Sequence, residues 1–142
     1  MVESGTPKWL VLDGYEDEPA AFGVPPYVGF HIRYLCGVLE QHRIDYHYMT
    51  IDQWRRFLKT KGPNAAEKLL ANITGFACIA GAVVPGKYLR VTPISIKEMK
   101  DVVASLPSEI PAILGGWAIR GWRHQGWNCL LYTSPSPRDS TL

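Results

Sequence analysis

Several acidic side chains follow a short apolar run near the start of the sequence. Asp13 comes directly after the run Trp9 to Leu12. A carboxylate in that place can bind a ribose, a metal ion or a phosphate, or can close a turn by accepting hydrogen bonds from nearby amides. Glu16, Asp17 and Glu18 come next. Such a run favours a solvated loop face over a cation site.

A basic segment, "PGKYLRVTP", follows a later apolar run. Lys87, Tyr88 and Arg90 of this segment could receive an anion, because Lys and Arg donate charge-assisted hydrogen bonds. An ordinary surface loop is the alternative. The length of the loop and its prolines favour a functional role.

Glycines stand together after the last apolar run. Gly115 and Gly116 would allow the backbone to approach a ligand or a neighbouring element closely, as would Gly121. The spacing matches neither the dinucleotide GxGxxG nor the GxxxxGK[ST] phosphate loop. A turn therefore explains the glycine pair better than a ligand does.

Histidines and cysteines show no spacing that is typical of a metal site. The three cysteines form no CxxC or CxxxCxxC group, and Cys36 and Cys78 fall on predicted buried faces, where thiols are inert. The histidines are more often structural at such positions: His31, His42, His47 and His124. No Ser/His/Asp or Cys/His arrangement stands out, so the residues alone predict no complete catalytic site.

Apolar patterns predict the elements that must position these side chains. Strands and helices alternate in the order β-α-β-α(α)-β-α-β, which predicts an α/β fold with an open parallel sheet of about four strands and helices on both faces. Ligands of such folds bind at the carboxyl ends of the strands, where three of the candidate loops begin. The expected elements are a strand at 9–12, a helix from about Pro26 to about Gln41, a strand from Tyr46 to Met49, a helix capped by Thr50 or Asp52, a helix after Gly62 and Pro63, a strand in "ITGFACIAGAVV", a helix with a Ser95 and Glu98 capping box, and a strand in "IPAILGGW".

Composition limits the class of protein. With 46% apolar and 20% charged residues, the 142-residue chain is expected to form one globular domain. The net charge of +2 does not indicate nucleic acid, and no apolar run is long enough for a membrane span. The start lacks the pattern of a signal peptide, so we expect the protein in the reducing cytoplasm. With nucleic acid and membrane not indicated, a small molecule is the class of ligand that stays open.

Two segments carry a family resemblance: "LDGYEDEPAAFGVPPYVGFHIRYLCGVLEQ" and "GAVVPGKYLRVTPISIKEM". They resemble the N-terminal region of a mainly archaeal family of radical SAM proteins that also carry a C-terminal helix-hairpin-helix motif. Together with "PAILGGWAIRG", the resemblance covers most of residues 8–126. Trp117 stands where the family has proline, and Val91 where it has glycine. The matching residues are Asp13, Gly14, Tyr15, Glu18, Pro19, Gly23, Pro25, Pro26, Pro85, Gly86, Lys87, Tyr88, Thr92, Pro93, Gly115 and Gly116.

The resemblance implies a Rossmann/flavodoxin-like domain, similar to a cobalamin-binding domain, placed before a radical SAM barrel. It implies that the whole protein cleaves S-adenosylmethionine reductively at a [4Fe-4S] cluster held by a CxxxCxxC loop. This chain has no such loop, so cluster and S-adenosylmethionine would belong to a C-terminal barrel of the same protein. The DxHxxG stretch whose histidine ligates cobalt is also absent.

Two interpretations therefore stay open. One is a degenerate accessory domain that shapes or covers the active site of the barrel, and the other is a free-standing Rossmann-like module that binds a nucleotide or a corrin at the same edge. The candidate ligand-binding residues are Asp13, Gly14, Tyr15, Glu18, Lys87, Tyr88, Arg90, Thr92, Gly115 and Gly116.

The last residues do not match the rest of the chain. Cys129 to Asp139, "CLLYTSPSPRD", equals the translation of a common transposase-adapter DNA read one base in, without a mismatch. The alternative is a natural Pro/Ser linker. We expect an N-terminal extension at 1–7, an incomplete Rossmann-like domain at 8–127 and an adapter-derived tail at 128–142. Trp127 is then the last wholly native residue, and Cys129 has no part in redox or metal chemistry.

Overall fold

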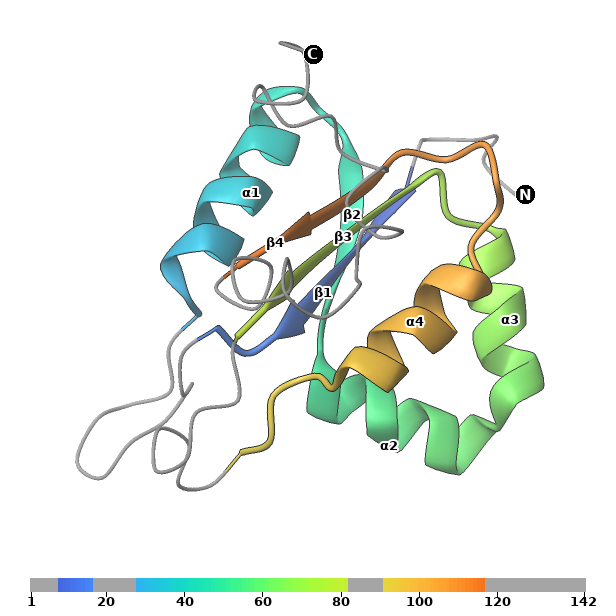
Figure 1. Cartoon of the computed structure of the whole chain (residues 1–142). Coiled ribbons are helices and arrows are strands. Elements are labelled where there is room, and N and C mark those ends of the chain that lie inside the picture. Colours follow the sequence, from blue (N-terminus) through green and yellow to red (C-terminus); the bar gives the residue numbers. More distant parts are fainter. Residues whose placement is uncertain (1–7, 17–27, 82–90, 117–142) are drawn as a thin grey trace, which may run out of the picture.

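The computed structural model describes residues 8–16, 28–81 and 91–116. They form four strands and four helices that alternate along the chain (Figure 1). In order, these are β1 (Lys8–Gly14), α1 (Phe30–Gln41), β2 (Asp45–Thr50), α2 (Ile51–Lys61), α3 (Pro63–Ala71), β3 (Gly75–Ala80), α4 (Ile96–Ala104) and β4 (Ala112–Gly115).

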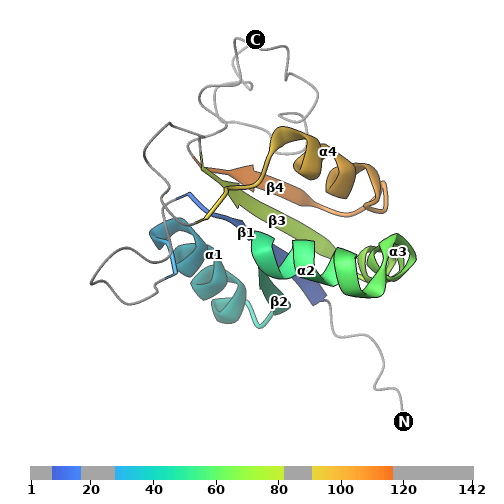
Figure 2. The same cartoon turned by 90° about the horizontal axis from the view of Figure 1, so that it is seen from below.

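The strands form one open sheet in the order β2-β1-β3-β4, and every neighbouring pair is parallel. Trp9 of β1 pairs with Tyr46 of β2 on one side and with Gly75 of β3 on the other. Helix α1 covers one face, and α2, α3 and α4 lie on the opposite face (Figures 1 and 2). The predicted α/β fold, with its parallel sheet and helices on both faces, is confirmed, and the strand order is that of flavodoxin-like folds.

Alternation along β1 divides the core into two parts. Leu10 and Leu12 pack into the larger cluster beneath α2, α3 and α4, whereas Val11 faces α1 together with Ile32 and Leu39. The central strand β3 is buried along its whole length. This agrees with the continuous apolar run that predicted a strand covered on both faces.

Helix starts follow the predicted capping signals. Thr50, and not Asp52, caps α2 in a box with Gln53, and Ser95 and Glu98 form the predicted box at α4. The first helix is predicted from about Pro26, which lies outside the described residues, but residues 28 and 29 are described and are not helical, so the predicted start is wrong there. Gly29 is extended (φ −56°, ψ 152°), so α1 begins at Phe30 and not before it. Within the described ranges, no helix has the length and apolar character needed to span a membrane.

Candidate functional site

The carboxyl ends of the four parallel strands meet at one edge of the sheet, called here the carboxyl edge. Helix α1, which follows β1 in the sequence, lies on one face of the sheet, and α4, which follows β3, lies on the other (Figure 1). Folds of this class bind ligands where neighbouring strands diverge in this way. The residues at this point are Asp13 and Gly14, which end β1, and Tyr15 and Glu16, which follow it.

Asp13 is buried and held by two hydrogen bonds. The Tyr15 amide donates to Oδ1 (3.0 Å) and the Tyr48 hydroxyl donates to Oδ2 (2.8 Å). Its exposed fraction is 5%, and desolvation raises its pKa, although the two hydrogen bonds partly oppose the shift. The hydrogen bond from the Tyr15 amide is the turn contact that the sequence predicts for Asp13. Burial and a raised pKa are also common among carboxyl groups of functional sites.

Glu16 is also buried, and its Oε2 contacts Nδ1 of His31 in the first turn of α1. The solvated loop face favoured by the sequence is therefore wrong for Glu16, because the chain brings a histidine fifteen residues later back onto it. Asp17 and Glu18 of the same run lie outside the described residues. When the Glu16 carboxyl is ionised, the imidazole Nδ1–H of His31 is the donor in this contact, and Nε2 is the ring nitrogen left for another partner.

Tyr15 turns the chain at the end of β1 with a left-handed backbone (φ 60°), which is uncommon for a residue other than glycine. Its ring is buried on the face opposite to Asp13, and its hydroxyl donates to Oδ2 of Asp52 (2.9 Å). The Ile94 amide donates to the Gly14 carbonyl (3.1 Å). These contacts fix the backbone of Gly14 and Tyr15 at the end of β1.

Arg55 joins α2 to the start of α4. Its guanidinium donates to both carboxylate oxygens of Glu98 (2.7 and 3.0 Å) and to Oδ1 of Asp52 (3.1 Å). It also donates to the carbonyls of Thr92 (2.7 Å) and Pro93 (3.1 Å). The Arg55 guanidinium holds the pKa of Glu98 down at about 2. The arginine therefore fixes the chain that enters α4 at this edge.

The glycines at this edge have little room for a side chain. A Cβ at Gly14 would lie 2.4 Å from Cγ2 of Ile94, and one at Gly116 would lie 2.2 Å from the Ala80 carbonyl oxygen. Gly116 also has a φ of +99°. Close packing of backbone against β3 therefore explains Gly116, in line with the turn favoured by the sequence.

Gly116→Ala is expected to lower the free energy of unfolding by about 2 kcal/mol, because alanine is strained at positive φ and its Cβ would meet Ala80. Chemical denaturation measures this. Gly37→Ala is the matched control: Gly37 is helical, and a Cβ there meets nothing within 4 Å. The control should gain about 0.5–1 kcal/mol. Equal effects of the two substitutions would contradict the role assigned to Gly116.

The structure gathers part of the predicted site. Asp13, Gly14 and Tyr15 lie together, and the Thr92 carbonyl belongs to the Arg55 cluster. Gly115 ends β4, and Gly116 follows it, both beside β3. The candidates outside the described residues are Glu18, Lys87, Tyr88 and Arg90. Residues of the site that were missed are Glu16, His31, Tyr48, Asp52, Arg55 and Glu98.

An iron–sulfur cluster does not fit the described cysteines. Cys78 is fully buried beneath α2, α3 and α4, whereas Cys36 packs on the α1 face. Burial raises the pKa of both thiols, as expected for the inert cysteines that the sequence predicts. The described ranges hold no group of three or more His, Cys, Asp or Glu side chains that could bind a metal ion.

Two archaeal proteins are similar to this chain. An uncharacterized protein of Methanocaldococcus jannaschii is 38% identical over 94 residues, which is 66% of this chain and 16% of that protein. An uncharacterized protein of Archaeoglobus fulgidus is 41% identical over 92 residues, 65% of this chain and 16% of that protein. The match thus spans about one sixth of either relative. No protein-family profile and no solved structure matches the chain.

Proposed function

We propose that this chain is the N-terminal accessory domain of a cytoplasmic radical SAM enzyme, with its carboxyl edge directed at a catalytic barrel in the rest of the protein. The family resemblance of residues 8–126 supports the affiliation. The length of the relatives supports a larger protein, since the match spans 16% of each. In this proposal, the [4Fe-4S] cluster and S-adenosylmethionine are held by the barrel.

The carboxyl edge is the observation that carries the proposal. Asp13 and Glu16 are both only 5% exposed, and each is oriented by a partner from another element, Tyr48 and His31 respectively. Fixing two carboxyl groups in a poorly solvated place costs free energy. Such a cost is typical of sites that bind or orient a ligand.

A second feature supports a contact with further protein. Phe30, Tyr34 and Val38 follow one another along α1 at intervals of four residues and are 74%, 69% and 37% exposed. The rings of Phe30 and Tyr34 stack with their centroids 6.4 Å apart. This stripe starts in the first turn of α1, beside the carboxyl edge (Figure 1). Large exposed side chains grouped in this way are typical of interaction surfaces.

Phe30→Ser combined with Tyr34→Ser is expected to keep the 142-residue chain monomeric at concentrations at least about twofold higher, because it removes exposed apolar surface. The free energy of unfolding should stay within about 0.5 kcal/mol of that of the parent chain. Light scattering and thermal melts measure the two quantities. In the intact protein, the same change should make this domain more sensitive to limited proteolysis. A large loss of stability in the short chain would instead assign the two rings to its own core.

The alternative is a free-standing module that binds a nucleotide or a corrin at this edge. Among the described residues, His31 would be the imidazole that this edge could offer to the cobalt of a corrin. A bound corrin would supply cobalt chemistry. The chain itself would contribute the imidazole, oriented by Glu16 through Nδ1.

The intact gene in the source organism tests the proposal. We expect the reading frame to continue past Trp127 and to encode CxxxCxxC. The reconstituted protein should produce 5′-deoxyadenosine from S-adenosylmethionine under reducing conditions. A natural stop codon near residue 130 would overturn the proposal. Titration with hydroxocobalamin tests the corrin version of the alternative, which requires a spectral change. Loss of that change in His31→Ala would assign the cobalt ligand to His31.

A further inference from the structure

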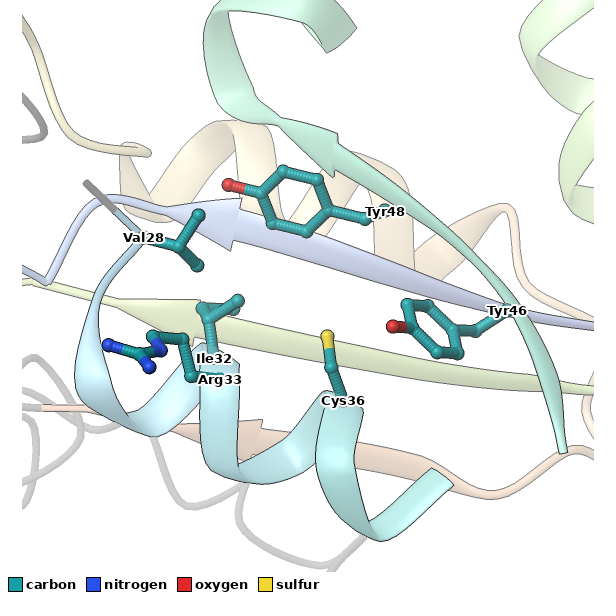
Figure 3. A pocket seen from close by; sticks show the side chains of 6 residues that line it. All are labelled: Val28, Ile32, Arg33, Cys36, Tyr46 and Tyr48. Atoms are coloured by element: carbon teal, nitrogen blue, oxygen red, sulfur yellow. The ribbon is translucent and has the colours of Figure 1, made fainter. Parts of the chain in front are cut away.

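A groove lies between α1 and the edge strand β2, on the face of the sheet that α1 covers (Figure 3). Its volume is about 430 Å³, within the range of small-molecule sites in proteins. The walls are mainly apolar and aromatic, with a few polar atoms. The lining residues are Val28, Ile32, Arg33, Cys36, Tyr46 and Tyr48.

The polar atoms sit at the two ends of the groove. The Arg33 guanidinium lies at the end marked by Val28 and the Tyr48 hydroxyl, and the Cys36 thiol and the Tyr46 hydroxyl point toward one another at the other end (Figure 3). Between the two ends, the floor is formed by Ile32 and the tyrosine rings. Such a surface suits a flat apolar body with polar groups at its ends.

Charge distinguishes the two ends. Arg33 is exposed and forms no ion pair with any residue in the described ranges. At the opposite end, the Tyr46 hydroxyl donates to Oε1 of Glu40 (2.7 Å). The exposed Arg33 guanidinium therefore attracts an anionic group to its end, where the Tyr48 hydroxyl already donates to the Asp13 carboxyl. Glu40 at the other end has no cation beside it in the groove lining. An exposed guanidinium can donate two parallel hydrogen bonds to a carboxylate or a phosphate.

We propose that this groove binds a small planar molecule that carries one anionic group, with its apolar body against Tyr46, Tyr48 and Ile32 and its anion on Arg33. This proposal does not rest on the proposed contact with a barrel. It has a link to the carboxyl edge, because the hydroxyl of Tyr48 donates to Asp13 while its ring lines the groove. A bound molecule would therefore lie against the side chain that orients Asp13.

The test uses the whole 142-residue chain and 6-hydroxy-2-naphthoate, a planar compound with a carboxylate at one end and a hydroxyl at the other. Calorimetry should show one site with a Kd at or below about 1 mM, as expected for a ligand of this size. Arg33→Gln should weaken binding about tenfold, because a charge-assisted contact is lost. Amide shifts in NMR spectra should concentrate on residues 28–36 and 46–48.

Three matched measurements make the result specific. Arg56→Gln removes an exposed arginine from α2, on the opposite face of the sheet, and should leave the affinity unchanged. The neutral analogue in which a hydroxymethyl group replaces the carboxylate should bind the parent chain and Arg33→Gln with equal affinity. Val28→Trp should fill the groove and abolish binding of both compounds. Absence of saturable binding up to 10 mM, equal losses in Arg33→Gln and Arg56→Gln, or shifts confined to another surface would each overturn the proposal.

Discussion

Arg55→Ala is expected to lower the free energy of unfolding by about 3 kcal/mol, or the melting temperature by roughly 10 °C. Arg55 makes five hydrogen bonds: four connect α2 with α4 and the segment entering it, and one is to Asp52 within α2. Its removal leaves Glu98 and two main-chain carbonyls without their cationic donor. The side chain is 29% exposed, so water replaces part of the loss, which places the expected effect below the largest values known for buried ion pairs.

Controls separate this role from a general effect of charge. Arg56→Ala removes an exposed arginine from the next position of α2 and should change the free energy of unfolding by less than about 0.5 kcal/mol. Arg55→Lys keeps the charge but cannot make the two parallel contacts with Glu98, so it should recover only part of the loss. If Arg55→Ala were as mild as Arg56→Ala, the connection between α2 and α4 would not depend on this arginine.

Acid should weaken the same connection. The pKa of Glu98 falls from its ordinary 4.5 to about 2 in the folded protein, with the Arg55 hydrogen bonds as the main cause. A lowered carboxyl pKa gives stability that is fully present above pH 4.5 and is lost as the pH falls toward 2. The difference in unfolding free energy between the parent and Arg55→Ala should therefore shrink over that interval. Denaturation at pH 7, 4 and 3 measures it.

Local signals predicted the fold well because its elements are specified locally. The Ser95 and Glu98 box, Pro63 at the start of α3 and the unbroken apolar run of β3 each act within a few residues. The alternation of strands and helices then requires a parallel sheet. The sequence places the start of the first helix too early because the spacing of Val28 and Ile32 suits a helix. In the structure the backbone is still extended at Gly29, so the helix begins at Phe30.

The site was predicted only in part because its contacts join distant positions. Asp13 could be found from its place after an apolar run, but its partner Tyr48 lies 35 residues away. Arg55 and Glu98 are 43 residues apart, and no short motif connects them. One signal was available: Tyr46 and Tyr48 alternate along β2 and therefore face the same side, which is the wall of the groove.

Asp13→Asn is expected to stabilise this domain by about 1 kcal/mol at pH 7 and, if the proposed function holds, to reduce formation of 5′-deoxyadenosine by the intact protein on the order of 100-fold. The asparagine can still accept from the Tyr15 amide, and its amide can donate to the Tyr48 oxygen. Burial raises the pKa of Asp13, so the ionised carboxylate opposes folding at neutral pH. That cost disappears in the uncharged variant.

The pH dependence of Asp13 has the opposite sign to that of Glu98. A raised carboxyl pKa means that the folded state gains stability as the pH falls through the folded pKa, so the advantage of Asp13→Asn should shrink in acid. Tyr48→Phe is the matched control, since it keeps the carboxylate but removes a hydrogen bond that favours its ionised form, and it should destabilise the domain at pH 7. Thermal melts at pH 7 and 4, with activity assays of the intact protein, measure both effects. A destabilised Asp13→Asn with unchanged activity would show that Asp13 only closes the turn at Tyr15, whereas a more stable and less active variant would mean that the carboxylate is kept there for the chemistry of its ligand.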